Sequence, residues 1–206
     1  MRIERLENSK HKQERVLVHL EDGNILRITG AELLQFGLYQ GLDLTPDTLA
    51  DLQAASRRAD TKRRGASMAS GRMLSKKELT ERLTKKGASP EDAADTADWL
   101  EGLGAVDDAA YAGVIARHYG GMGYGPGRVR QELHHRGIPK ELWDEALEQL
   151  PPPEEAIRKF LRTKLRGRPL TPEDSRRLAA ALQRRGFAWQ DIRPALHELG
   201  QEIDET

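Results

Sequence analysis

Three short stretches of this sequence contain residue types that bind phosphate or metal ions in other proteins. The glycine-rich stretch 120–127 lacks the G-x-G-x-x-G spacing of a phosphate loop, no Gly-Lys-Ser/Thr follows it, and a helical pattern precedes it. His134 and His135 would point about 100° apart on a helix, with no carboxylate at ligand spacing. Asp107 and Asp108 fit ordinary partners of a helix dipole. We therefore interpret the glycines as a flexible joint and predict no nucleotide site, metal or cofactor.

The chemistry that remains is the recognition of negative charge, since nothing in the sequence resembles a nucleophile with its base and we expect no enzyme. Residues 151–197 carry 11 basic and 5 acidic side chains, although the formal net charge of the whole chain is zero. Arg158, Arg162 and Arg166 recur at intervals of four and would share one face of a helix. Further basic residues extend this face: Lys159, Lys164 and Arg168.

The candidate contact residues for a protein partner or DNA are all basic. Some of them precede turn glycines, where cations stabilise helix C-termini by ~0.3–1 kcal/mol each, so part of the pattern is structural. The clustering over 158–185 exceeds that need, and we expect a face that binds a polyanion or an acidic partner, with a merely solvated face as the alternative. The full set is Lys85, Lys86, Arg128, Arg130, Arg136, Arg158, Lys159, Arg162, Arg166, Arg176, Arg177, Arg184 and Arg185.

The elements that must position these side chains repeat about every 50 residues. Three stretches match: Leu83-Thr-Lys-Lys-Gly87, Leu133-His-His-Arg-Gly137 and Leu182-Gln-Arg-Arg-Gly186. The leucine four positions before each glycine, and an apolar residue four positions earlier, would lie on one helical face, and a glycine after basic residues is typical of a helix end. A second helical pattern follows each glycine. Such a period indicates a repeat architecture in which neighbouring units bury their apolar faces.

We expect a mainly α-helical fold, with tandem three-helix repeats forming an elongated curved array behind a small N-terminal β-ribbon. Ser75 and Glu78 form a predicted capping box at the start of the first repeat. Pro194 lies inside the last helix, where proline costs roughly 3 kcal/mol, so that helix is kinked or begins late. The predicted segments are repeat 1 over 72–122, repeat 2 over 123–168, and a truncated repeat 3 with an acidic tail over 169–206.

Residues 1–44 have the pattern of strands followed by a short helix. Val16, Val18 and Leu20 alternate with polar residues, and Asp22-Gly23 predicts a two-residue turn into a second strand. Ile3–Leu6 is a candidate third strand. A ribbon this small requires the following helices as a packing partner.

Residues 45–71 are predicted to connect the ribbon to the repeats. Thr45 and Pro46 open a helix that extends to about Arg64. The small residues of 65–71 fit a linker or a continuation of that helix equally well.

Composition narrows the cellular context. The chain contains no cysteine, which excludes disulfides, cysteine-ligated zinc, iron–sulfur clusters and thiol catalysis. It has no apolar run of membrane-spanning length, and its first residues lack the apolar core of a signal peptide. We expect a cytoplasmic monomer that does not contact membranes.

Three motifs follow one another in this sequence: Ser75-Lys-Lys-Glu-Leu-Thr-Glu-Arg-Leu-Thr-Lys-Lys-Gly87, Leu100-Glu-Gly-Leu-Gly-Ala-Val-Asp-Asp-Ala-Ala-Tyr-Ala112 and Gly125-Pro-Gly-Arg-Val-Arg-Gln-Glu-Leu-His-His-Arg-Gly-Ile138. In this order they resemble the RecX family of bacterial regulators of the RecA recombinase. The resemblance covers about residues 55–197. The sequence departs from the family pattern at Val129, in its glycine-rich joint, at Pro194 and in its short end.

The resemblance implies a tandem array of three-helix units that binds RecA filaments on single-stranded DNA. It also implies inhibition of filament growth, ATP hydrolysis, strand exchange and LexA co-cleavage, without enzymatic activity of its own. Direct DNA binding without RecA is the main alternative, and a helical adaptor for an unrelated protein is the third.

Overall fold

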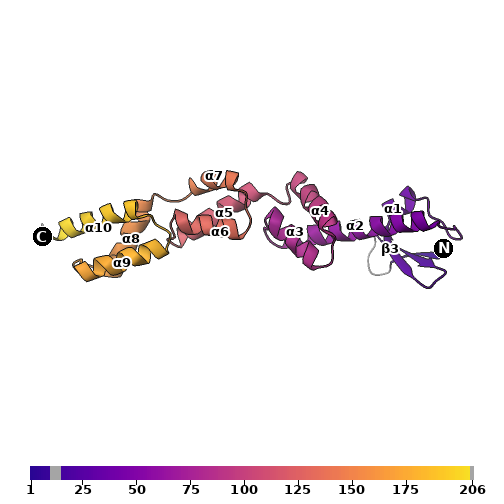
Figure 1. The fold of residues 1–206 in the computed structure, drawn as a ribbon, viewed down its shortest axis with the longest axis horizontal. Coiled ribbons are helices and arrows are strands. Elements are labelled where there is room, and N and C mark those ends of the chain that lie inside the picture. Colours follow the sequence, from indigo (N-terminus) through magenta and orange to yellow (C-terminus); the bar gives the residue numbers. More distant parts are fainter. Residues whose placement is uncertain (10–14, 205–206) are drawn as a thin grey trace. The chain divides into compact units, whose positions relative to one another are not determined.

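The computed structural model describes residues 1–9 and 15–204. As the sequence predicts, this part of the chain is mainly α-helical, with a small three-stranded antiparallel sheet near the N-terminus (Figure 1). The described residues form two compact units. Unit 1 comprises Met1–Arg72 and Leu79–Ala105, and unit 2 comprises Met73–Glu78 and the chain from Val106 onward.

The sheet of unit 1 confirms the predicted ribbon and its third strand. It consists of β1 (Ile3–Asn8), β2 (Arg15–Leu20) and β3 (Ile25–Thr29), in the order β1-β2-β3. Val16 lies opposite Ile28 and both are buried, because alternate side chains of a strand point to the same face. Leu52 of a following helix packs into the same apolar cluster, so the ribbon does use a helix as its packing partner.

The turn between β2 and β3 is one residue longer than predicted. The Leu20 N–H donates to the Asn24 carbonyl at 2.9 Å, which leaves Glu21, Asp22 and Gly23 as a three-residue turn. Gly23 has φ +81°, the left-handed conformation that closes such a turn and that glycine adopts without strain. The Asp-Gly pair therefore gave the correct place for the turn but not its length.

Two helices follow the sheet, α1 (Gly30–Gln35) and α2 (Pro46–Gly71). Residues 65–71 continue α2 and do not form a linker. Gly65 lies where α2 is in close contact with another helix, since an added Cβ would be 2.6 Å from Thr96 Cγ2 and 3.2 Å from Leu100 Cδ1. Both contacts belong to α4 (Pro90–Gly102), so the missing side chain allows α2 and α4 to pack closely.

The helix α3 (Lys76–Lys85) begins with the predicted capping box. The Ser75 N–H donates to Glu78 Oε2 at 3.2 Å, and the Glu78 N–H donates to Ser75 Oγ at 3.0 Å. Leu79 and Leu83 are buried, as their spacing predicts. Ser89 then caps α4 by accepting a hydrogen bond from the Asp92 N–H at 3.1 Å.

Unit 2 contains two groups of helices, each around its own apolar core. The first group is α5 (Asp108–Gly121), α6 (Pro126–His135), the short 3-10 helix η1 (Lys140–Leu142) and α7 (Trp143–Leu147). The second group is α8 (Pro153–Leu165), α9 (Pro172–Arg184) and α10 (Trp189–Asp204). Tyr111, Leu133 and Ala146 lie in one core, and Ile157, Leu182 and Ile192 in the other.

These cores begin one helix earlier than the predicted repeats 123–168 and 169–206. The core of α5–α7 spans the predicted boundary after residue 122, and α8 supplies the first helix of the last group, where the sequence predicts a truncated repeat. A repeated motif fixes the length of a period but leaves its starting point open. The elongated curvature expected of the array stays a prediction.

The three motif glycines end their helices as predicted. Gly87, Gly137 and Gly186 have φ values of +90°, +71° and +89°. In each case the glycine N–H donates to the carbonyl three residues before it. The N–H of the residue after the glycine donates to the carbonyl of the leucine four positions before the glycine, as Ile138 does to the Leu133 carbonyl at 3.0 Å. This is the Schellman pattern, which satisfies helix-end carbonyls.

The glycine-rich stretch 120–127 is a packed contact and not the flexible joint that we expected. The Gly125 N–H donates to the Arg185 carbonyl at 2.8 Å, and the Gly127 N–H donates to the Gly186 carbonyl at 2.9 Å. An added Cβ at Gly125 would lie 2.7 Å from the Gly186 oxygen. The glycines are therefore required for the start of α6 to approach the end of α9, a contact that no local pattern reveals.

Pro194 neither delays nor interrupts α10, which begins at Trp189 and continues to Asp204. Ile192, Ala195 and Leu196 on this helix are buried, as their spacing predicts. A proline this close to a helix N-terminus removes a single backbone hydrogen bond, and burial of the apolar face offsets that loss. Within the described ranges, no helix is long and apolar enough to cross a membrane.

Candidate partner-binding surface

A strongly basic hollow of unit 2 lies between α8 and α9, and we refer to it as the α8–α9 groove. Its volume is about 590 Å³. It is lined by Phe160, Thr163, Lys164, Arg166, Arg168, Arg177, Leu178, Ala181 and Arg184. Five of these nine side chains are cationic and none is a carboxylate. The groove is thus suited to anions, because its positive charges are close together and concave surfaces concentrate their field.

Local helix geometry explains why the cations line one hollow. On α8, Ile157, Leu161 and Leu165 point into the core, which leaves the neighbouring Lys164 exposed. On α9, Arg177, Ala181 and Arg184 follow each other at intervals of four and three residues and so share a face. Alanine at the middle position keeps the space between the two arginines open.

An aromatic ring lies among these cations. The Lys164 Nζ lies 5.8 Å from the centre of the Phe160 ring, and the Arg185 guanidinium carbon lies 4.9 Å from it. Such contacts are worth about 0.5–1 kcal/mol at exposed sites and orient the cations.

Arg166 lies in the groove but does not extend the helical face of Arg158 and Arg162 as predicted. The helix α8 ends at Leu165, and Arg166 has φ +51°, with Gly167 after it at +80°. This left-handed turn moves Arg166 off the helical face, because the extrapolation by four residues holds only inside a helix. The Arg166 N–H still donates to the Arg162 carbonyl at 2.9 Å and closes the last turn.

The remaining candidates of α8 and α9 differ in their ion pairs and in whether they line the groove. Arg158 pairs with Glu198 at 2.6 Å, and Arg177 pairs with Asp174 at 2.5 Å on the same helix. Arg184 lines the groove, whereas three exposed residues lie outside its lining: Lys159, Arg162 and Arg176. The structure therefore brings together Arg166, Arg177 and Arg184, with Lys164 and Arg168.

Three further candidates, outside the α8–α9 groove, also have structural partners inside unit 2. Arg185 donates to the carbonyls of Met122 and Gly123 at 3.2 and 3.0 Å, beside the packed glycines. Arg128 pairs with Glu132 at 2.7 Å. The Arg185 bonds join the end of α9 to the turn before α6, and the Arg128 pair lies within α6.

Arg136 is the third of these residues and joins α6 to two other segments. Its guanidinium donates to the Tyr111 hydroxyl at 2.5 Å and lies 3.7 Å from Glu78 and 4.0 Å from Glu132. Burial acts to lower the pKa of Arg136, but the Tyr111 oxygen and the two carboxylates outweigh it and raise that pKa above its usual value. Arg136 is therefore charged in the folded protein and is held by these groups.

The last three candidates are not part of the groove lining. Lys85 and Lys86 are exposed in unit 1, and Arg130 is exposed on α6. The Lys86 carbonyl accepts a hydrogen bond from Arg64 at 3.1 Å.

Comparison with known proteins matches the helix groups of unit 2 to two family models. Residues 107–147 match the second three-helix domain of RecX, and residues 153–196 match its third three-helix domain. The regulatory protein RecX of Xanthomonas oryzae pv. oryzae is 33% identical over 123 residues, which cover 59% of this chain and 77% of that protein. The chain belongs to the RecX family. The α8–α9 groove lies within the third three-helix RecX domain.

Longer matches agree with this RecX assignment. The regulatory protein RecX of Bacillus pumilus is 29% identical over 98% of this chain and 80% of its own length. A crystal structure of regulatory protein RecX has the same fold, with a TM-score of 0.77, 24% identity and 98% of both chains covered. A crystal structure of RecX from Lactobacillus salivarius, at 16% identity, covers 70% of this chain and 97% of its own, with a TM-score of 0.63.

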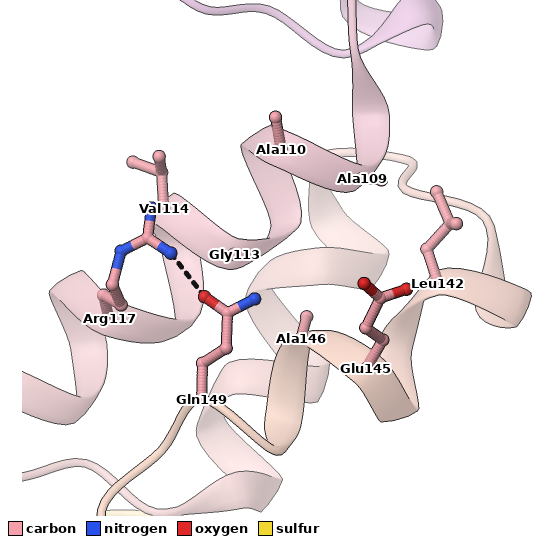
Figure 2. Close-up of a pocket in the computed structure, with 9 residues that line it drawn as sticks. All are labelled: Ala109, Ala110, Gly113, Val114, Arg117, Leu142, Glu145, Ala146 and Gln149. Carbon is pink, nitrogen blue, oxygen red and sulfur yellow. Dashed lines mark hydrogen bonds between the residues drawn. The ribbon is translucent and has the colours of Figure 1, made fainter.

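A second hollow of unit 2 lies in the second three-helix RecX domain and is much less charged. It has a volume of about 340 Å³ and lies between α5 and α7 (Figure 2). Arg117 and Glu145 are its charged side chains, and Arg117 donates to Gln149 beside Gly113. Over residues 1–9 and 15–204, no three His, Asp or Glu side chains come together as metal ligands.

Proposed function

We propose that this RecX-family chain is a negative regulator of RecA recombinase in the cytoplasm. In this proposal it binds the RecA filament on single-stranded DNA and inhibits ATP hydrolysis, strand exchange and LexA co-cleavage. Family membership supports a regulatory role, and the α8–α9 groove is the observation on which the mode of binding rests.

The groove offers charge recognition without a catalytic group. Arginine binds carboxylate and phosphate oxygens in bidentate geometry, and charge-assisted hydrogen bonds of this kind are roughly twice as strong as neutral ones. A filament presents both acidic protein surface and DNA phosphates. Lys164, Arg166 and Arg184 would contact such groups, and occupancy of the filament by this chain would exclude other ligands.

A charge-reversal experiment compares cations that line the groove with cations of the same two helices that lie outside its lining. Lys164→Glu with Arg184→Glu should reduce inhibition of the ATPase activity of RecA on single-stranded DNA by tenfold or more, since each reversal replaces an attraction with a repulsion. Lys159→Glu with Arg176→Glu is the matched control, because it changes the same charges on α8 and α9 outside the groove lining. Equal inhibition by both variants, with unchanged helicity, would show that the groove is not the contact.

Direct DNA binding without RecA is the second candidate, favoured by the absence of carboxylates in the lining of this described groove. It predicts affinity for oligonucleotides that falls steeply with added salt. A chain that binds DNA in this way but leaves RecA activities unchanged would support this alternative over the regulatory role.

A further inference from the structure

Unit 1 carries a cluster of basic side chains that the proposed function does not use. We call it the arginine cluster, and it comes from β2, β3, α2 and the end of α3. Its members are Arg15, Arg27, Arg63, Arg64 and Lys86.

The sheet presents two of these arginines on the face away from its core. Val16 and Ile28 are buried, and because strand side chains alternate, Arg15 and Arg27 point to the opposite face. The Ser56 hydroxyl of α2 donates to the Arg27 carbonyl at 2.5 Å. This bond holds α2 beside β3, and the Asp60 carboxylate of α2 accepts a hydrogen bond from Arg15 and lies 3.6 Å from Arg63, so Arg15 of the sheet lies close to Arg63 of α2.

The helix α2 and the turn after α3 complete the cluster. The Arg64 guanidinium donates to the Lys86 carbonyl at 3.1 Å, which places the Lys86 backbone next to α2. A hollow of about 440 Å³ is lined here by Arg63, Arg64, Ser67, Met68 and Lys86. Three of the five lining side chains are cationic, and none of these described residues is acidic.

The carboxylates near the cluster do not balance its charge. Asp60 accepts a hydrogen bond from Arg15 and also lies 3.6 Å from Arg63, so two arginines share one carboxylate. Glu32 is buried and bonds to the Thr29 backbone in the capping box of α1. Burial first, and then the charges of Arg63, Arg27 and Arg64, lower the pKa of Arg15, and the charge of Glu32 opposes them without reversing the shift.

We propose that the arginine cluster binds the phosphodiester backbone of DNA. Phosphates fit because Arg63, Arg64 and Lys86 line one open hollow, and Arg15 lies close to Arg63 at the Asp60 carboxylate that they share. Protein interfaces instead centre on apolar or aromatic anchors, and Met68 is the one apolar side chain of the described hollow lining. Without an aromatic lining for base stacking, recognition is independent of base sequence. The proposal needs no RecA, and it differs from the second candidate function because the DNA contact lies in unit 1 and not in the α8–α9 groove.

The test measures binding of the full chain to labelled oligonucleotides, one single-stranded and one duplex, by fluorescence anisotropy over a series of salt concentrations. Arg63→Gln with Arg64→Gln should weaken binding roughly tenfold at low salt. It should also reduce the slope of log K against log salt by about 2 for duplex or about 1.4 for a single strand, the release expected for two lost phosphate contacts. The strand type with the larger change identifies the natural form of the backbone.

Arg58→Gln with Arg72→Gln is the matched control, since both arginines are exposed and lie outside the hollow lining. It should leave affinity and slope unchanged. The same pairs are compared in a chain that also carries Lys164→Glu and Arg184→Glu, which isolates unit 1 from the α8–α9 groove. The single change Arg27→Gln on β3 provides a second, milder variant with an expected slope reduction of about one.

An unchanged slope in Arg63→Gln with Arg64→Gln and in Arg27→Gln would overturn the proposal. A second result would also overturn it: Arg63→Gln with Arg64→Gln keeps its affinity for DNA but loses binding to DNA-free RecA. The cluster would then be a site for an acidic protein surface. Failure of the chain to inhibit RecA leaves these DNA measurements unaffected and counts against the proposed function alone.

Discussion

Replacement of Gly125 by alanine should destabilise unit 2 through the contact between α6 and α9. The new Cβ would lie 2.7 Å from the Gly186 oxygen and from Phe187 Cδ1, and 2.8 Å from the Gly186 carbonyl carbon. Two of these three atoms belong to the backbone and cannot rotate away. Relief of the overlap requires a shift of several tenths of an ångström, which also stretches the 2.8 Å bond from the Gly125 N–H to the Arg185 carbonyl.

The expected loss in the free energy of unfolding is about 2–3 kcal/mol. Overpacking of this kind costs about 1–3 kcal/mol and a weakened hydrogen bond about 1 kcal/mol. The lower chain entropy of unfolded alanine returns about 0.4–1 kcal/mol. For a chain of this length, the melting temperature should fall by about 5–10 °C.

Urea and thermal unfolding followed by tryptophan fluorescence and circular dichroism measure this effect, since Trp143 and Trp189 both lie in unit 2. Gly121→Ala is the matched control on the preceding helix, where an added Cβ meets nothing within 4 Å. Equal stability of Gly125→Ala and Gly121→Ala would refute the view that the glycines are required for close packing.

Two further substitutions test packing elsewhere. Arg136→Ala should lower the free energy of unfolding in urea by about 1.5–3 kcal/mol, because it removes a hydrogen bond to Tyr111 and one ionic partner of Glu132. Arg130→Ala, the control on the same helix, should change it by less than about 0.5 kcal/mol. Equal effects of the two variants would contradict the structural role of Arg136. Gly65→Ala should lower the melting temperature by a few degrees despite the better helix propensity of alanine, because its Cβ would overlap Thr96, and Gly71→Ala, which meets nothing, should not lower it. A more stable Gly65→Ala chain would show that α4 moves away without cost.

Local patterns predicted most of the secondary structure. The spacing of Leu79 with Leu83 and of Val129 with Leu133 indicates helical faces, and all four residues are buried. The glycines after these helices adopt the left-handed conformation that their position predicts. Such features depend on a few neighbouring residues, so a single sequence is enough to reveal them.

Features that depend on distant residues could not be predicted. The close approach of Gly125 to Gly186 joins positions 61 residues apart, and nothing local distinguishes it from a flexible loop. The phase of the repeats depends on which helices share a core, which a period leaves undefined. The four-residue spacing predicts Arg166 on the helical face of Arg158 and Arg162, but α8 ends at Leu165, and Gly167 is a local signal for that helix end.

Two of the bonds between the start of α6 and the end of α9 join the main-chain amides of Gly125 and Gly127 to main-chain carbonyls, so neither bond depends on a charged side chain. Exposed charges elsewhere on the two helices can therefore change with these two bonds preserved. Ionic strength should therefore affect the binding of anionic ligands and the main-chain hydrogen bonds of Gly125 and Gly127 differently. A high salt concentration should weaken the binding of anionic ligands to the exposed cations, because salt screens these charges. The uncharged hydrogen bonds of Gly125 and Gly127 should persist, so the chain should release its ligand and stay folded.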